Sequence, residues 1–296
     1  MARRMTRQLL LDGHAAEYTR PRWPLLKWIG SKYRYAETIA SHFPRDFRAY
    51  YEVFLGSGAL LGTVAPDRGV GADSFSPLVE IWQTLQRNPD TVKRWYADRW
   101  RLAMRGERVA GYEQIKQSYN ASPNGADFLF LTRACYGGVV RFRKNDGYMS
   151  TPCGIHTPIH PESFAMRVDE WASRVRNSRF ILADYREVMA EAKAGDLVYC
   201  DPPYAHTQTI VYGAQGFDLG ELFKAIARCK DRGVRIALSI DGTKRSGDFV
   251  CDLALPGGLF ERETRIRCGR SMLRRFQMNG RTLEKEEVTD RLLLTY

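Results

Sequence analysis

The chain has 296 residues, of which 44% are hydrophobic and 27% are charged. This composition argues against a disordered chain, and the length suits one large domain or one domain that carries an insertion. Lys and Arg (45) outnumber Asp and Glu (34), so the formal net charge is +11. That excess favours a polyanionic partner, most simply nucleic acid, although a basic soluble surface is the plain alternative.

Cysteine spacing and hydropathy narrow the class of protein further. The six cysteines form no C-x-x-C pair and no close Cys/His cluster: Cys135, Cys153, Cys200, Cys229, Cys251 and Cys268. We therefore expect no metal site and no disulfide framework, which fits a reducing cytoplasm. No apolar run approaches the roughly 20 residues of a membrane helix, and the N-terminal apolar segment is too short for a signal peptide.

The first part of the chain predicts half of a nucleotide-binding α/β fold. Residues 1–20 are polar and weakly patterned and predict a flexible arm, whereas residues 21–90 are expected to belong to the core. The predicted elements are a helix at 35–42, a strand at 51–54, a helix at 59–64 and a strand at 69–72. A glycine turn follows the first strand and Asp73 follows the second, an order that is typical of such a half.

The pattern changes between residues 91 and 178, and we expect an insertion there. A basic, Trp-containing helix is predicted at 91–104, and Asn-Asp-Gly at 145–147 predicts the tip of a β-hairpin. Alternation of helices and strands then resumes over 179–296. The predicted elements are strands at 180–182, 197–200, 234–240 and 290–296, with a helix at 219–231. One α/β core interrupted by an insertion explains this layout.

The segment Asp201-Pro202-Pro203-Tyr204 directly follows a short apolar run that suits a buried parallel strand. It would therefore leave the carboxyl end of that strand, where open α/β sheets bind ligands. Asp201 and the Pro202 carbonyl are two acceptors for the hydrogens of an aromatic amine, and the two prolines stiffen the bend. Tyr204 supplies an aromatic face for a base. An ordinary tight turn is the alternative for this segment alone.

Other residues suit the binding of a nucleotide-like cofactor, each with a plainer alternative. Gly56 and Gly58 let a ligand approach the backbone where a strand turns into a helix, and Asp73 could accept both hydroxyls of a ribose. Lys27, Trp28 and Lys32 could serve a carboxylate and a flat ring. The alternatives are an ordinary strand–helix turn, an exposed loop acid and a solvated helix edge.

Basic and aromatic residues are mixed in the predicted insertion, as they are in surfaces that contact phosphates and bases. The candidates for nucleic-acid binding in the insertion are Arg133, Arg141, Arg143, Lys144 and Tyr148, and Lys27 of the N-terminal segment is a further candidate for DNA binding. A charge-rich hairpin that is merely solvated remains the alternative.

The order of these motifs resembles the Dam-like, or D12, class of DNA N6-adenine methyltransferases. The resemblance covers roughly residues 24–296 and rests on four segments: K-W-x-G-x-K at 27–32, Phe-Leu-Gly-Ser-Gly at 54–58, Asp73, and the tetrapeptide at 201–204. Gly137, where relatives often carry asparagine, and Asp241, in place of a commoner Asn, depart from the pattern. These departures concern the target sequence more than the reaction.

The resemblance implies an α/β, Rossmann-like methyltransferase core with a mostly parallel seven-stranded sheet and an inserted, mainly helical target-recognition domain containing a β-hairpin. The resemblance also implies that the family's cofactor, S-adenosylmethionine, binds to this set of residues: Trp28, Lys32, Gly56, Gly58, Asp73, Asp184 and Asp201. No metal is required. The catalytic residues would be Asp201, Pro202, Pro203 and Tyr204.

The implied reaction is site-specific methylation of adenine N6 in double-stranded DNA, with the adenine flipped out of the helix. Methylation of cytosine N4 and a DNA-binding relative without activity are the alternatives. A separately encoded restriction endonuclease is a possible partner. We expect a monomer or a weak dimer that acts in the cytoplasm and has no membrane contact.

Overall fold

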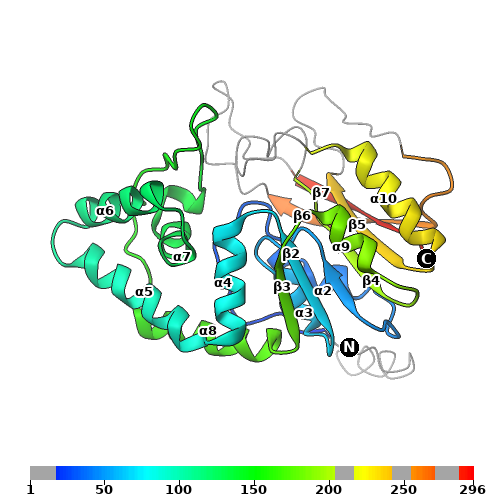
Figure 1. The fold of residues 1–296 in the computed structure, drawn as a ribbon, viewed down its shortest axis with the longest axis horizontal. Helices are drawn as coiled ribbons and strands as arrows, with labels where there is room; N and C mark the ends of the chain where they lie inside the picture. The colour runs from blue at the N-terminus through cyan, green and yellow to red at the C-terminus, as the bar shows by residue number, and fades with distance from the viewer. Residues whose placement is uncertain (1–17, 204–216, 242–254, 271–286) are drawn as a thin grey trace, which may run out of the picture.

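A computed structural model describes residues 18–203, 217–241, 255–270 and 287–296. Its centre is a seven-stranded sheet in the order β3-β2-β1-β4-β5-β7-β6 (Figure 1). The strands are β1 (Tyr50–Glu52), β2 (Gly69–Asp73), β3 (Ser178–Leu182), β4 (Leu197–Cys200), β5 (Arg235–Asp241), β6 (Arg262–Arg270) and β7 (Glu287–Leu294). The expected seven-stranded sheet is confirmed, although β6 was not predicted.

Strands β1 to β5 are parallel, and β7 runs antiparallel between β5 and β6. The chain moves outward from β1 to β2 and β3, and then returns to place β4 on the other side of β1. The strand order therefore reverses between β1 and β4. Open α/β sheets bind ligands at the carboxyl ends of the strands at such a reversal.

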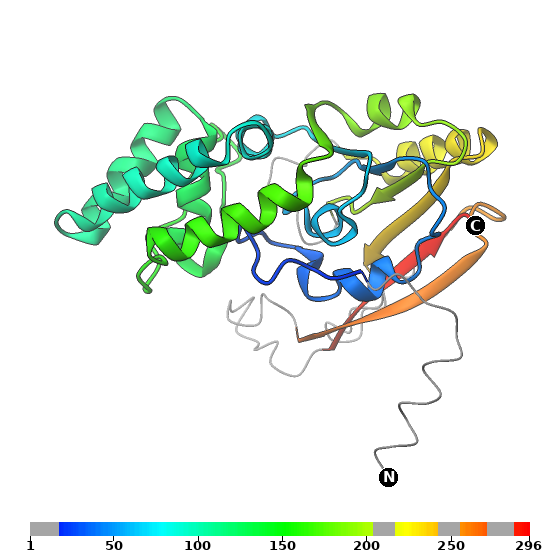
Figure 2. The same cartoon turned by 90° about the horizontal axis from the view of Figure 1, so that it is seen from below.

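Helices cover both faces of the sheet, as Figures 1 and 2 show. Those packed around the sheet are η1 (Lys32–Arg34), α2 (Ala36–Ala40), α3 (Ala59–Val64), α4 (Ser76–Arg87), α9 (Tyr185–Glu191) and α10 (Leu219–Asp231). Side chains alternate along β4, so Tyr199 enters one apolar cluster while Val198 enters the other, with Met189 and Ile226 of α9 and α10. Both faces of β4 are buried, which explains its continuous apolar sequence.

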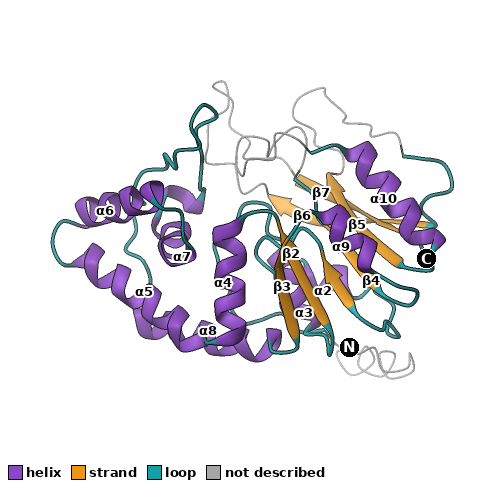
Figure 3. Cartoon of the chain, in the orientation of Figure 1, coloured by secondary structure: helices purple, strands orange, loops and turns teal. Residues whose placement is uncertain are grey.

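The segment between β2 and β3 carries a group of helices to one side of the sheet (Figure 3). They are α5 (Pro89–Met104), α6 (Arg108–Ala121), α7 (Gly125–Ala134), η2 (Tyr136–Gly138) and α8 (Pro161–Val175). Every residue of α7 is buried, and α4, α5 and α6 all pack on it. We keep 91–178 as our proposed limits of the recognition insertion.

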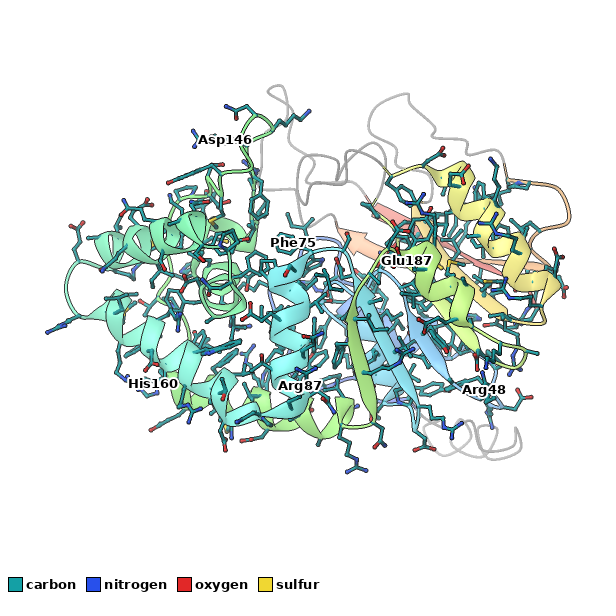
Figure 4. All side chains as sticks on the ribbon, in the orientation of Figure 1. Arg48, Phe75, Arg87, Asp146, His160 and Glu187 are labelled. Carbon is teal, nitrogen blue, oxygen red and sulfur yellow. The ribbon has the colours of Figure 1, made fainter. Side chains whose placement is uncertain are left out.

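The predicted β-hairpin follows η2 and is confirmed. Phe142 and Met149 form an antiparallel bridge, and Arg143 N donates to Tyr148 O at 2.9 Å. Gly147 closes the turn with a φ of +67°, a value that favours glycine. Asp146 lies at the hairpin's tip, away from the helices (Figure 4). In the described part of the chain, no helix is both long and apolar enough to cross a membrane.

Candidate active site

A cleft lies where the strand order reverses, beside the ends of β1 and β4. It holds about 390 Å³ of empty space, part of it open to solvent. Its lining comes from the N-terminal motif, the end of β1, the glycine turn and the start of the motif after β4: residues 28–32, Glu52, residues 54–57, Ala59, Leu60 and Asp201. Segments that are far apart in the sequence therefore meet at the edge of the sheet where the sequence predicted a ligand site.

The glycine turn is shaped by two residues with left-handed backbone conformation. Gly56 has a φ of +47° and Gly58 a φ of +60°. A Cβ atom on Gly56 would lie 2.8 Å from Nε1 of Trp28, and one on Gly58 would lie 2.9 Å from Cζ2 of Trp82. Both conformation and space therefore require glycine here, and of the two glycines Gly56 lines the cleft whereas Gly58 is buried.

We predict that Gly56→Ala lowers the free energy of unfolding by about 1–3 kcal/mol, because alanine meets both backbone strain and the Trp28 ring. Affinity for S-adenosylmethionine, the cofactor that the resemblance implies, should fall as well, because Trp28 and Gly56 line the same cleft. Thermal unfolding and a titration with S-adenosylmethionine would measure the two effects. Gly147→Ala is the control, since Gly147 shares the positive φ but a Cβ atom on it would meet nothing within 4 Å. Equal behaviour of the two variants would contradict the steric argument.

Asp73 fastens the glycine turn from the end of β2. Its Oδ2 accepts a hydrogen bond from Gly56 N at 3.0 Å, and its Oδ1 accepts one from Phe75 N at 3.1 Å. Burial raises the pKa of the Asp73 carboxyl, and these backbone donors oppose the rise. A carboxylate has about four acceptor sites, so these two contacts leave capacity for a ligand.

Lys32 joins the N-terminal motif to the motif after β4. Its Nζ lies 2.6 Å from Oδ1 of Asp201 and 3.6 Å from Oδ2 of Asp290, and it donates to Gly30 O at 3.3 Å. Lys32 is only 5% exposed and Asp201 is 18% exposed. The ammonium of Lys32, expected to contact the cofactor, is thus directed to the carboxylate of Asp201.

Asp290 and Glu52 belong to this cluster and were not singled out in the sequence. Asp290 is a buried acid in the middle of β7, and Glu52 is a buried acid that ends β1. Glu52 Oε2 accepts hydrogen bonds from Leu61 N at 2.6 Å and from the Tyr50 hydroxyl at 3.3 Å. Burial raises the pKa of Glu52 well above its ordinary value, the N–H of Leu61 opposes this, and the charge of Asp201 adds to it. The available signals were a single acid within the apolar run 50–55, which is Glu52, and an acid shortly before the apolar run 292–294, which is Asp290.

Two contacts tie the N-terminal motif to its neighbours. The Ser31 and Ser57 hydroxyls are 2.7 Å apart, and the Trp28 ring packs edge-on against Phe128 of α7, with the ring centres 6.2 Å apart.

The rest of the predicted catalytic motif directly follows Asp201: Pro202 is buried and Pro203 is half-buried. Tyr204 lies outside the described residues.

Asp184 lies one strand beyond Asp73 and caps α9. It accepts from Arg186 N at 2.9 Å and pairs with Arg186 Nε at 2.7 Å. The hydrogen bond from the Arg186 side chain lowers the pKa of Asp184. These contacts assign Asp184 a helix-capping role, and its cofactor contact stays a proposal.

Two of the basic candidates lie at the base of the hairpin. Arg133 is 6% exposed, and its guanidinium donates to Leu25 O at 2.7 Å and lies over the Phe164 ring. Burial lowers the pKa of Arg133 to about 10. Arg133 therefore holds α7 against the N-terminal segment, and we leave it out of the proposed DNA surface. Lys27 is exposed and donates to Arg133 O at 3.4 Å.

The hairpin itself carries the other candidates. Arg141, Arg143 and Lys144 are exposed, and Tyr148 is half-buried. The Arg143 guanidinium lies 4.2 Å from the centre of the Tyr148 ring and pairs with Asp146 at 3.0 Å. This arrangement presents cations and an aromatic side chain on one projecting element.

Comparison with known proteins agrees with the geometry. A family model described as the D12 class of N6 adenine-specific DNA methyltransferases matches residues 28–246. A DNA adenine methylase of Vibrio cholerae is 29% identical over 231 residues, which cover 72% of this chain and 79% of that protein. A DNA adenine methylase of Serratia marcescens is 31% identical over 61% of this chain and 66% of its own length.

A third relative is much longer. The DNA N-6-adenine-methyltransferase of Escherichia phage P1 is 26% identical over 80% of this chain, which corresponds to 32% of the phage protein. The family match spans most of the chain and includes the N-terminal motif from Trp28, the glycine turn, Asp73 and the motif at 201–204. The chain therefore belongs to the D12 class of N6 adenine-specific DNA methyltransferases.

Proposed function

We propose that this enzyme methylates N6 of adenine at a specific sequence in double-stranded DNA, that it takes the methyl group from S-adenosylmethionine, and that it acts on an adenine flipped out of the helix. The observation that carries the proposal is the position of Asp201. Its carboxylate follows β4 at the reversal of strand order, borders the cleft and is oriented by Lys32 at 2.6 Å.

The residues of the cleft fit S-adenosylmethionine. Gly56 and Trp28 line the cleft, Gly58 shapes the turn beside them, and Asp73, which holds the turn, retains acceptor sites for hydroxyls. Bound there, the cofactor would supply a methyl group on a positively charged sulfur. Trp28, Gly56, Gly58 and Asp73 would hold it, whereas Lys32 would act mainly through Asp201.

Asp201 and Pro202 would prepare the target amine. The lone pair of an aromatic amine is delocalised into the ring, and acceptors at both N–H groups draw the nitrogen toward tetrahedral geometry. The Asp201 carboxylate has enough acceptor sites to keep Lys32 on Oδ1 and still accept one N–H. The Pro202 carbonyl would accept the other. Fixed acceptors of this kind accelerate a reaction because they need no reorganisation in the transition state.

The target nitrogen is inaccessible inside a stacked base pair, so the adenine must leave the helix at a cost of about a few kcal/mol. We propose that Tyr204 stacks on the extruded adenine. Contacts between the hairpin and the phosphates would offset part of this cost.

We predict that Lys144→Ala weakens DNA binding to a similar degree for all sequences. Lys144 is an exposed cation on the projecting hairpin, and we propose that it contacts a phosphate, which carries no sequence information. The slope of log Kd against log salt should fall by about one unit. Fluorescence anisotropy with labelled duplexes at several salt concentrations would measure both effects. Lys224→Ala on α10 is the control, because Lys224 is 67% exposed but lies on the other side of the sheet. An unchanged slope for Lys144→Ala would remove the hairpin from the DNA surface.

The product identifies the reaction. Purified protein is incubated with S-adenosylmethionine and genomic DNA from a methylation-deficient host, and the digested nucleosides are separated and weighed by mass spectrometry. We expect N6-methyladenine. N4-methylcytosine would replace the proposal with the cytosine alternative, and saturable DNA binding without any methylated nucleoside would indicate an inactive relative. Sequencing of the modified bases would then give the recognised site.

A further inference from the structure

Two cysteines face each other across the base of the recognition hairpin. Cys135 follows α7, Cys153 follows the hairpin, and the two residues form an isolated antiparallel bridge. The flanking backbone hydrogen bonds are Tyr136 N to Pro152 O and Gly154 N to Ala134 O, both 2.8 Å long. Because these bonds flank the pair and do not join it, Cys135 and Cys153 are a non-hydrogen-bonded pair. The Cα atoms of such pairs are about 4.5 Å apart.

This separation falls within the Cα–Cα range of disulfides, about 4.4–6.8 Å. Both thiols are free, and each is directed to another partner: Cys135 Sγ lies 3.9 Å from Thr132 O, and Cys153 Sγ lies 3.6 Å from Gly154 O. Bond formation therefore requires rotation of the two side chains, while the backbone already has a suitable spacing.

The two sulfur atoms have different surroundings. Cys135 is 2% exposed, whereas Cys153 is half-buried and its Sγ lies 3.0 Å from Nη1 of Arg108. Burial raises the pKa of the Cys153 thiol, and the Arg108 guanidinium opposes this rise because it stabilises the thiolate, the reactive form of cysteine. Arg108 also donates to the carbonyls of Gly154 and Ile155, so the segment that carries Cys153 is held in place. An oxidant would therefore reach Cys153 first.

We propose that Cys135 and Cys153 form a reversible disulfide that cross-links the base of the recognition hairpin. With a disulfide oxidant such as oxidised glutathione, the Cys153 thiolate attacks a glutathione sulfur and releases one glutathione thiolate. Cys135 then loses its proton, attacks Cys153 Sγ and releases the second glutathione. Two cysteine thiols are thus oxidised to one disulfide, and one oxidised glutathione is reduced to two glutathione molecules.

The cross-link would enclose the part of the chain that we propose contacts DNA, and this consequence rests on the proposed function. Residues 136–152 lie between the two cysteines and include Arg141, Arg143, Lys144 and Tyr148. The disulfide would tie both ends of this segment to the end of α7. The cleft is formed by other segments, so it would keep its shape.

Peptide mapping tests the cross-link. The full chain is incubated with oxidised glutathione, blocked with iodoacetamide and digested with trypsin without reduction. Cys135 lies in the tryptic peptide 134–141 and Cys153 in the peptide 145–167. We expect these two peptides as one linked species, two hydrogens lighter than their sum, that separates on addition of dithiothreitol. A stable glutathione adduct on Cys153 alone, linkage to another cysteine, or no reaction would overturn the proposal.

Three variants assign the linkage. Cys153→Ser and Cys135→Ser should both abolish the linked species, and Cys135→Ser should accumulate the glutathione adduct on Cys153. Cys229→Ser is the matched control, because Cys229 is a buried cysteine on α10, outside the bridge, and its loss should leave the linkage unchanged. Persistence of the linked peptides in either bridge variant would contradict the assignment. The map does not depend on methylation, so failure of the proposed function would leave this test intact.

The consequence for DNA is measured separately, by anisotropy with the oxidised chain before and after dithiothreitol. We expect oxidation to change the affinity for a labelled duplex, because the cross-link restrains both ends of the segment that carries the proposed contacts. Reduction should restore the original affinity, and binding of S-adenosylmethionine should be equal in both states. A linked chain with unchanged DNA affinity would refute the effect on the hairpin.

Discussion

The variant Asp201→Ala should lose nearly all methyl transfer while keeping most of its affinity for DNA. Asp201 would supply one of the two acceptors for the target amine, and removal of one preorganised polar group from a reacting centre lowers kcat by about 10²–10³-fold. DNA affinity should persist because the proposed phosphate contacts come from the hairpin. Single-turnover methylation and duplex anisotropy would measure the two properties independently.

The loss of Asp201 also leaves Lys32 with one fewer carboxylate, so part of the effect could come from a weakened fold. Asp196→Ala separates the two causes. Asp196 is fully buried and pairs with Arg48 at 2.7 Å, at the opposite end of β4 from Asp201. This control should lower the free energy of unfolding and leave the single-turnover rate near that of the unaltered enzyme. An undiminished rate in Asp201→Ala would refute the role of Asp201.

The sequence predicted the core of the fold because its strands are short apolar runs that end in distinctive residues. The run before Asp201 is buried on both faces as β4, and the glycine turn after β1 adopts the left-handed conformation that its glycines permit. Asn145-Asp146-Gly147 became a hairpin tip because its glycine tolerates a positive φ. Strand β6 was not predicted, because arginine and glutamate outnumber its apolar residues, of which Ile266 is buried.

Contacts between distant segments could not be predicted in the same way. Lys32 and Asp290 are far apart in the sequence, and they meet only because β7 inserts beside β5. Cys135 and Cys153 match no spacing motif, yet the hairpin between them returns the chain to a bridge. Arg133 belonged to a mixed basic and aromatic segment, but the apolar residues around it bury the whole of α7.

The variant Lys32→Met should lower both stability and catalysis. It leaves Asp201 and Asp290, 18% and 7% exposed, without the cation that lies between them. Removing one member of a buried ion pair lowers the free energy of unfolding by about 3–5 kcal/mol. Loss of the Nζ contact should also let the Asp201 carboxylate rotate, and a displacement of about 1 Å at a reacting centre can cost about 10²-fold in rate. Denaturant unfolding and single-turnover methylation would measure the two effects.

Lys116→Met is the matched control for this variant. Lys116 is also buried and pairs with Glu113 at 2.7 Å, but it lies on α6, away from the cleft. Its loss should lower the free energy of unfolding by about 1 kcal/mol or less, because Glu113 is 37% exposed, and should leave kcat unchanged.

Asp290→Asn provides an intermediate case, since it keeps the Lys32–Asp201 contact and removes only the negative charge of Asp290 beside Lys32. If Lys32 acts by orienting Asp201, kcat should fall progressively from the unaltered enzyme to Asp290→Asn to Lys32→Met, while the KM for S-adenosylmethionine changes little. A large rise in that KM with an unchanged kcat would instead assign Lys32 to the cofactor, as the sequence first suggested.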